Sequence, residues 1–430
     1  MPSTALKTAL INAEKKYIAS NPKSQTRYHE ASRVMPGGNT RTVIFYSPFP
    51  VTFEKGEGAY LWDLDGHHYT DYLGEYSAGL YGHSHPAIRK AVVDSLDYGT
   101  VLGGPNLHET ELAREICKRF PSCDLIRFCN SGTEANLLAL CAARAITGRS
   151  HVLGFEGGYH GGVLKMFPNE ALNVPIPMVL GQYNDIETTR ELVKTHAGDL
   201  AAIIVEPMMG SGGAIPGDSA FLSYLRETAD EHGIILIFDE VMTSRLSPGG
   251  LQSRLGIQPD LTSFGKYLGG GFSFGAFGGK AEIMSRFDPS KSNSYAHAGT
   301  FNNNIMSMTA GLAGLREAAT TDALTQLNQT GDWLREEMNA AAKALSVAVQ
   351  VTGVGSIMTM HFQTNPIHRP ADITSAPEKH ALIHLEMMSR GIYFARRGYM
   401  ALSLALTDED HQRMLSAFKD FLSDNQDALH

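Results

Sequence analysis

No apolar stretch of this 430-residue sequence approaches the roughly 20 residues that a membrane-spanning helix needs, and the longest strongly apolar run covers only residues 234–238. Residues 1–20 also lack the continuous apolar core of a secretory signal. They contain apolar residues at the spacing of an amphipathic helix, namely Leu6, Ala9, Leu10, Ala13 and Tyr17. We therefore expect no membrane partner.

Cysteine and positive charge are also scarce. The four cysteines form no CxxC pair and are too few to hold a chain of this length together. We expect thiols in a reducing compartment, which favours the cytoplasm, at Cys117, Cys123, Cys129 and Cys141. Lys and Arg number 36 against 45 Asp and Glu, giving a net charge of -9. A general nucleic-acid binder needs an excess of cations, so we expect no nucleic-acid partner.

Glycine, by contrast, is abundant, and short apolar runs alternate with longer helical patterns through the middle of the chain. The 43 glycines exceed the roughly 7% share typical of globular proteins and indicate tight turns and backbone close to a ligand. We expect strands at residues 125–129, 151–155, 201–205 and 234–238, with helices between them. This alternation predicts an α/β fold with a mostly parallel sheet.

Helix-start signals support this prediction. Ser131 and Glu134 have the spacing of a capping box before the apolar run 135–146, and Thr407 and Asp410 form a second box. Asp218 and Gly233 bracket another helical pattern.

The two ends of the chain differ from its middle. Strand-like pieces at 50–53 and 60–63 are joined by turns such as 55–58, and a helix at 332–345 precedes strands at 349–351, 356–362 and 400–404. We therefore predict a large central domain, residues 76–329. A smaller α+β lobe would combine residues 1–75 and 330–430.

Two charged residues follow predicted strands, where an α/β sheet builds its sites. Asp239 is either a cap for the next turn or an acid held in low dielectric to pair with a protonated ring nitrogen. Lys266 precedes Gly269-Gly270-Gly271, where flexible backbone lets a desolvated, nucleophilic amine approach a cofactor. An exposed loop lysine has the same sequence signature.

Two other segments favour an aromatic phosphate ligand. Ser131, Gly132 and Thr133 begin a helix, whose free N–H groups, hydroxyls and dipole suit a phosphate as well as simple capping. The glycines of 157–162 leave Tyr159 and His160 exposed in a turn, where either ring lies on an aromatic ligand or forms a structural corner.

Together, an acid for a pyridinium, a lysine for an aldehyde, a helix start for a phosphate and an aromatic side chain for a ring describe pyridoxal 5'-phosphate. The motifs, in chain order, resemble the class III aminotransferases over nearly the whole chain: 130–135 (NSGTEA), 159–161 (YHG), 206–207 (EP), 238–243 (FDEVMT), Lys266 and 299–301 (GTF). Residues 36–41 (PGGNTR) and 268–271 (LGGG) are most similar to the branch of glutamate-1-semialdehyde aminomutase and the β-phenylalanine (β-amino acid) aminotransferases.

The resemblance implies a fold type I pyridoxal phosphate-dependent transferase and a homodimer with shared active sites. Lys266 would bind the cofactor covalently and, once released, move a proton between Cα and C4′. Asp239 would keep the pyridine nitrogen protonated, and Tyr159 would stack on the ring. The phosphate would be held by Ser131, Gly132 and Thr133, joined by Thr300 of the partner subunit. Glu206 is either a participant or a strand-end acid that orders the loop at Pro207.

Two arginines are candidates for binding substrate carboxylates. Arg41 and Arg397 resemble the arginines that hold the β-amino acid and 2-oxoglutarate, respectively, in β-phenylalanine aminotransferases. Each is alternatively a surface or interface arginine. Arg396 should face the opposite side from Arg397, because neighbouring residues of a strand alternate. Aromatic residues that either line a substrate pocket or pack in the core are Phe45, Tyr46, Tyr76 and Tyr81.

The resemblance implies ping-pong transfer of an amino group from a β-amino acid or related amine to an α-keto acid, 2-oxoglutarate or pyruvate. Alternatives are a glutamate-1-semialdehyde 2,1-aminomutase, an (S)-selective amine transaminase and a non-catalytic relative, the last disfavoured by the retention of Lys266 and Asp239. We expect no metal site, because His83 and His85 lack a third ligand at suitable spacing. No GxGxxG fingerprint supports a nicotinamide dehydrogenase.

Overall fold

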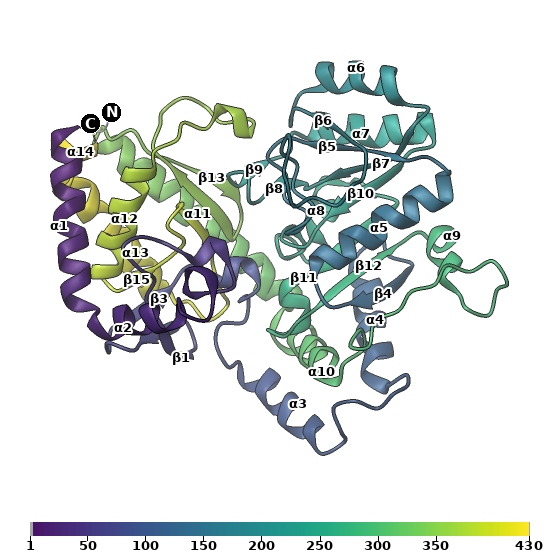
Figure 1. Cartoon of the computed structure of the whole chain (residues 1–430), viewed down its shortest axis with the longest axis horizontal. Coiled ribbons are helices and arrows are strands. Elements are labelled where there is room, and N and C mark those ends of the chain that lie inside the picture. Colours follow the sequence, from purple (N-terminus) through teal and green to yellow (C-terminus); the bar gives the residue numbers. More distant parts are fainter. Residues whose placement is uncertain (1–2, 430) are drawn as a thin grey trace. The chain divides into compact units, whose positions relative to one another are not determined.

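The computed structural model describes residues 3–429, which divide into two compact units (Figure 1). Unit 1 contains residues 3–85, 329–366 and 373–429, and unit 2 contains residues 86–328 and 367–372. The passage from unit 2 to unit 1 near residue 328 lies inside the long helix α11 (Thr321–Ala344). No helix within residues 3–429 combines the length and the apolar composition needed to span a membrane.

A seven-stranded sheet forms the centre of unit 2. In spatial order its strands are β4 (Leu125–Cys129), β12 (Gly275–Gly279), β11 (Leu261–Gly265), β10 (Ile235–Asp239), β7 (Leu200–Val205), β5 (His151–Phe155) and β6 (Met178–Gly181). All pairs are parallel except the two that β12 makes, which are antiparallel. The predicted mostly parallel sheet is confirmed. Its middle strands are continuous apolar runs because helices cover both faces of such sheets.

Helices surround this sheet. They are α3 (Pro86–Leu96), α4 (Leu107–Arg119), α5 (Gly132–Thr147), α6 (Ile186–His196), α7 (Ser219–His232), α8 (Gly250–Leu255), α9 (Ala281–Met284) and α10 (Ile305–Ala313). Helix α5 crosses β12, β11 and β7, while α7 packs on β10 and β7 (Figure 1). Ala135, Ala139 and Ala143 of α5 are fully buried, so this helix lies close to the strands. Short β8 (Met208–Met209) and β9 (Ile215–Pro216) form a hairpin.

Unit 1 combines segments from both ends of the chain. Its four-stranded sheet has the order β1 (Phe53–Glu57), β2 (Tyr60–Asp63), β3 (His68–Asp71) and β15 (Ile392–Tyr393). A second sheet contains β13 (Gln350–Val354), β14 (Ile357–His361) and β16 (Tyr399–Ala401). The helices are α1 (Thr4–Ser20), α2 (Pro22–Ala31), α12 (Pro377–Ser389), α13 (Asp408–Asp424) and α14 (Gln426–Leu429), and α1 lies beside α12 and α14 (Figure 1).

Several predicted bounds differ from the structure. The first strand begins at Phe53 rather than at residue 50. As a result, Gly56, which was predicted to lie in the turn 55–58, lies inside β1. Strand β16 ends at Ala401, three residues before the predicted end, because its ladder with β14 covers only Tyr399–Ala401 and the N–H of Leu404 already donates to the carbonyl of Leu80. Helix α11 begins at Thr321, eleven residues before the predicted start at 332. Polar residues at its first turns had hidden this extension.

Candidate functional site

The carboxyl ends of β4, β5, β7, β10 and β11 lie at one edge of the unit 2 sheet, because these strands are parallel (Figure 1). Strand β12 runs the other way, so it begins at this edge with Gly275, which pairs with both Gly265 and Cys129. Each segment singled out in unit 2 from the sequence, apart from Thr300, follows one of these strands. The topology therefore gathers residues that are far apart in the chain.

Asp239 ends β10 with a fully engaged carboxylate. Its Oδ2 accepts hydrogen bonds from His160 Nδ1 at 2.8 Å and Asn136 Nδ2 at 2.7 Å, and its Oδ1 accepts one from the Val241 N–H at 3.0 Å. The side chain is buried, so these donors compensate for lost hydration of the charge. Two donors on one oxygen fix the direction of the remaining lone pairs, which suits recognition of a single further N–H group.

Lys266 directly follows β11, next to the strand that ends in Asp239. Asp239 pairs with Ser263, three residues before Lys266. The backbone φ of Lys266 is 56°, in the left-handed region that residues with a side chain rarely adopt. Such a conformation costs about 1–3 kcal/mol and is concentrated at functional sites. Lys266 and Asp239 therefore occupy neighbouring strand ends, as a shared site requires.

The start of α5 lies against the same two strand ends. A Cβ on Gly265 would lie 3.6 Å from the backbone N of Gly132, and a Cβ on Gly132 would lie 2.9 Å from the Val241 side chain. Glycine at both positions allows this close approach. The first helical turn leaves the N–H groups of Gly132 and Thr133 without an intrahelical acceptor. Together with the helix dipole, they provide an anion site between the two strands.

The predicted capping box of α5 is only half present. Ser131 Oγ accepts a hydrogen bond from the Glu134 N–H at 3.1 Å, as expected for an N-cap. The Glu134 carboxylate, however, accepts a bond from the N–H of Asn130 at 2.6 Å instead of that of Ser131. Consequently Glu134 braces the residue that joins β4 to the helix and leaves the backbone N–H of Ser131 outside the box.

The turn after β5 separates its two aromatic residues. Tyr159 is 41% exposed, whereas His160 is buried and bonded to Asp239. The prediction that both rings are exposed is therefore wrong for His160: its hydrogen bond to the carboxylate turns the imidazole into the protein. Gly161 has φ of 142° and touches Thr133 so closely that an added Cβ would stand 2.4 Å from its hydroxyl. This contact joins the Tyr159 turn to the start of α5.

Glu206, after β7, accepts hydrogen bonds from backbone N–H groups rather than from a charged side chain. Its two carboxylate oxygens accept hydrogen bonds from the N–H groups of Tyr159 at 3.0 Å and Gly210 at 2.9 Å. Burial raises the pKa of Glu206 to about 7; the charge of His160 opposes this rise and that of Asp239 adds to it. The acid thus orders the loop that carries Tyr159.

In unit 1, Arg41 and Arg397 meet at one aromatic ring. The guanidinium carbons lie 5.6 Å and 5.5 Å from the centre of the Tyr76 ring, and Arg41 also forms an ion pair with Glu75. Arg397 lies in the tight turn before β16 and additionally faces Tyr399 at 5.6 Å. Arg396 has other neighbours. Burial and, to a smaller extent, the charge of Arg396 lower the pKa of His384 to about 3, and burial lowers the pKa of Arg396 itself, which Tyr46 opposes. The two adjacent arginines therefore have different surroundings.

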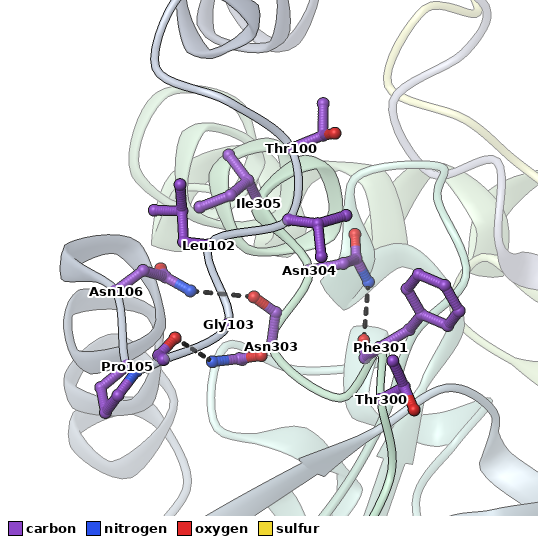
Figure 2. Close-up of a pocket in the computed structure, with 12 residues that line it drawn as sticks. Thr100, Leu102, Gly103, Pro105, Asn106, Thr300, Phe301, Asn303, Asn304 and Ile305 are labelled. Atoms are coloured by element: carbon purple, nitrogen blue, oxygen red, sulfur yellow. Dashed lines mark hydrogen bonds between the residues drawn. The ribbon is translucent and has the colours of Figure 1, made fainter.

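Thr300 lies in a polar loop that borders a cavity of about 430 Å³ in unit 2 (Figure 2). Asn106 donates to the backbone carbonyl of Asn303 at 2.9 Å, and Asn303 donates to that of Gly104 at 3.1 Å, so the segments on either side of the cavity are tied together. Asn130 Nδ2 donates to Asn302 Oδ1 at 3.0 Å. This bond links the Thr300 loop to the end of β4.

Sequence reasoning missed the role of Asn136. It lies in an apolar helical run, yet its amide donates to both Asp239 and the carbonyl of His160. The available signal was a polar amide side chain inside an apolar helical run, one turn after the helix start at Gly132. Of the aromatic candidates for a pocket, Tyr46 is buried in unit 1, where its hydroxyl accepts from the Val51 N–H at 2.9 Å.

The residues at this sheet edge fit pyridoxal 5'-phosphate. The oriented Asp239 carboxylate matches a protonated ring nitrogen, and the N–H groups at the α5 start match a phosphate. The Gly132–Gly265 approach, where a side chain would collide with Val241, keeps the backbone donors accessible between the strands. The amine of Lys266, at the neighbouring strand end, is of the chemical type that condenses with an aldehyde.

Comparisons with known proteins give a consistent result. A family model described as aminotransferase class-III matches residues 45–422. The chain is 47% identical over 424 residues to a β-phenylalanine transaminase of Variovorax paradoxus, covering 98% of each chain. It is 36% identical to glutamate-1-semialdehyde 2,1-aminomutase 2 of Brevibacillus brevis, covering 92% of this chain and 97% of that protein.

Solved structures agree with these matches. A β-phenylalanine aminotransferase from Variovorax paradoxus has a TM-score of 0.97 at 46% identity, with 98% of both chains covered. A transaminase solved with PLP bound has a TM-score of 0.88 at 31% identity, covering 95% of this chain and 99% of that one. The predicted fold type I architecture is confirmed.

Proposed function

Since this chain belongs to the class III aminotransferases and uses pyridoxal 5'-phosphate, we propose that it moves the amino group of a β-amino acid to an α-keto acid, 2-oxoglutarate or pyruvate. The observation that carries the proposal is the convergence of Arg41 and Arg397 on Tyr76. Both substrates of such a ping-pong reaction carry a carboxylate, and a guanidinium recognises a carboxylate through a planar pair of N–H donors. The 47% identity to a β-phenylalanine transaminase supports the donor class.

When bound, pyridoxal phosphate withdraws the electron pair that remains after a proton leaves the amino-bearing carbon of the substrate. In the proposed mechanism, Asp239 keeps the ring nitrogen protonated, because its carboxylate is buried and directed by His160 and Asn136. The amine of Lys266 takes the proton from the substrate carbon and returns it. Each role is assigned to a residue at the same sheet edge.

Binding and orientation fall to the neighbouring segments. Ser131, Gly132 and Thr133 hold the phosphate at the α5 start, and Tyr159, whose turn is fixed by Glu206, covers the ring. Unit 2 is thus the cofactor-binding domain of the proposal, with limits close to the predicted 76–329. Arg41 binds the carboxylate of the β-amino acid and Arg397 that of the keto acid.

We further propose a homodimer in which Thr300 of the partner subunit completes each phosphate site. Three apolar side chains that line the cavity bordered by Thr300 are more than half exposed, namely Val101, Leu102 and Phe301, and so are Tyr98 and Leu107, which flank the lining segment 100–106 in the sequence. Such a cluster is typical of a protein interface. A cytoplasmic location agrees with the four cysteines, all of which are free thiols.

A donor screen tests the proposed function. With 2-oxoglutarate or pyruvate as acceptor, β-phenylalanine should be a better donor than 1-phenylethylamine, which has no carboxylate for Arg41. Purified protein should be yellow, and Lys266→Ala should lose both this absorbance band and activity. A band that persists unchanged in Lys266→Ala would contradict the assignment of the lysine.

The aminomutase is the second candidate, because a glutamate-1-semialdehyde 2,1-aminomutase is 36% identical to the chain. An aminomutase returns the amino group to the same carbon skeleton and needs no external keto acid. Conversion of glutamate-1-semialdehyde without an added acceptor, together with no reaction of β-phenylalanine, would favour it over the transaminase.

A further inference from the structure

The segment Gly74–Ser77 of unit 1 has an unusual backbone. Glu75, Tyr76 and Ser77 have φ values of 46°, 53° and 79°, and Gly74 has 51°, so four consecutive residues lie in the left-handed region. Three of them carry side chains, for which this conformation costs about 1–3 kcal/mol each. Strain of this kind persists only where the surroundings enforce it, and here it determines the directions of two side chains.

Packing against β16 holds this strained turn in place. A Cβ on Gly74 would stand 2.5 Å from the carbonyl oxygen of Ala401, so the turn lies directly on the strand. The N–H groups of Leu73 and Gly74 donate to Asp71 Oδ1 at 2.8 Å and 3.1 Å. The turn is therefore fixed at its start by the hydrogen bonds to Asp71, and it packs against β16.

The turn places the Tyr76 ring between two cations. Its hydroxyl donates to the Val43 carbonyl at 2.8 Å, and its ring stacks on Tyr399 with 5.6 Å between centres and 22° between planes. The ring is buried and cannot swing away. Arg41 and Arg397 each lie within 6 Å of its centre, the range in which a ring attracts a cation.

The two arginines also have individual contacts. Glu75 forms an ion pair with Arg41, and the Tyr399 ring faces Arg397. Tyr76 is the group that both share. Two guanidinium groups repel each other when no anion lies between them, so a common electron-rich face reduces the cost of keeping both near one place.

We infer that Tyr76 is a positioning residue that holds both carboxylate-binding arginines, so that one ring sets the affinity for the donor carboxylate and for the acceptor carboxylate. This inference rests on the proposed function, which assigns those roles to Arg41 and Arg397. Tyr76 acts through the electrons of its ring rather than through its hydroxyl, which is occupied by Val43. Its effect should therefore appear with substrates that carry a carboxylate and be absent with simple amines.

The test replaces Tyr76 by 3,4,5-trifluorophenylalanine, which keeps the size of the ring but removes most of its attraction for cations. Holoenzyme would be studied by isothermal calorimetry with 3-phenylpropionate and glutarate, which resemble the donor and the acceptor without reacting. Affinity for both acids should fall by about two- to fivefold, since a cation–ring contact contributes about 0.5–1 kcal/mol at exposed sites. The half-reaction KM values for β-phenylalanine and 2-oxoglutarate should rise equally, and that for 1-phenylethylamine should not change.

Two further variants separate the ring from its surroundings. Tyr76→Phe, which keeps the ring and loses the hydroxyl, should retain the wild-type affinities. Tyr399→Leu removes a ring that faces Arg397 directly and reaches Arg41 only through its stack on Tyr76, so it should weaken glutarate more than 3-phenylpropionate. Loss of binding in a folded Tyr76→Phe, or equal effects of Tyr399→Leu on both acids, would overturn the inference.

The outcomes also distinguish this inference from the proposed function. A wild-type enzyme that binds neither acid overturns both. A wild-type enzyme that binds them, with a trifluoro variant that binds them equally well, overturns the role of Tyr76 alone and leaves the transaminase assignment intact.

Discussion

Asp239 and Glu240 are adjacent acids with different surroundings. Asp239 is held by two side chains from other elements, His160 and Asn136. Glu240 accepts bonds from the N–H groups of Leu251 at 2.8 Å and Gln252 at 2.9 Å, and from Thr243 Oγ1 at 2.8 Å. Burial raises the pKa of Glu240, and these donors counteract it. Glu240 thus organises α8, whereas Asp239 is directed toward the candidate cofactor site.

We predict that Asp239→Asn lowers turnover by about 10- to 100-fold, because a neutral amide cannot keep the ring nitrogen protonated. The range corresponds to the roughly 1.5–3 kcal/mol of a charged hydrogen bond. The measurement is kcat with β-phenylalanine and 2-oxoglutarate. Glu240→Gln is the matched control: it should lower the unfolding temperature while its folded fraction keeps turnover close to wild type. Equal kcat losses in both variants would contradict the distinct roles.

The raised pKa of Glu206 predicts a pH-dependent stability. The side chain has an ordinary pKa of 4.5 when unfolded and about 7 when folded, so between these values the unfolded state releases a proton that the folded state keeps. Stability contributed by Glu206 is therefore fully present below pH 4.5 and is lost as pH rises through 7. Relative to Glu206→Gln, the wild type should lose stability from pH 5.5 to 7 in urea unfolding, and the difference should level off above pH 8. A flat difference across this range would contradict the assignment.

At the scale of elements, helix starts show how far a local pattern extends. The predicted capping box of α13 is complete: the Asp410 N–H donates to Thr407 Oγ1 at 3.2 Å, and the Thr407 N–H donates to Asp410 Oδ2 at 3.0 Å. At α5 the acid instead holds Asn130. Asp218, which precedes α7 as the sequence pattern indicates, makes no side-chain cap bond. The same residue types therefore served different donors, because the chain entering each helix has a different direction.

We predict that Thr407→Ala lowers the free energy of unfolding by about 1 kcal/mol, since it removes the side-chain acceptor of the α13 cap. Urea unfolding followed by circular dichroism measures the change. Thr407→Ser keeps the hydroxyl and should remain near wild type. If Thr407→Ser loses as much stability as Thr407→Ala, the cap is not the source of the effect.

Strand prediction succeeded for buried apolar strands and failed for a polar strand at the edge of a sheet. Residues 125–129 and 151–155 form β4 and β5 with the predicted bounds, because each is a short apolar run between turn signals. The edge strand β1 is mostly polar and partly exposed, with the sequence FEKGE, so apolar content placed it too early. Edge strands form through pairing with a neighbour, here β2, which a local pattern does not reveal.

For the molecule as a whole, the proposed homodimer predicts a shift in mass on disruption of the apolar cluster. Leu102→Glu should convert the dimer to monomer in light scattering, because it places a charge among the exposed apolar residues beside the Thr300 cavity (Figure 2). If Thr300 of the partner subunit completes the phosphate site, the variant should also lose affinity for the cofactor. Ile146→Glu, on the exposed side of α5, is the control and should stay dimeric. A Leu102→Glu variant that remains dimeric would contradict this interface.

The sequence by itself determined the chemical groups of the site and the class of fold: an acid, a lysine and a helix start each follow an apolar run, and runs of this kind form parallel strands. Only the tertiary structure decided which of these groups touch. Asn136 and His160 reach Asp239 because α5 and the turn after β5 cross the end of β10, and both arginines meet at Tyr76 because a strained turn packs on β16. Side-chain direction depends on packing between segments far apart in the chain, and no local pattern encodes that packing.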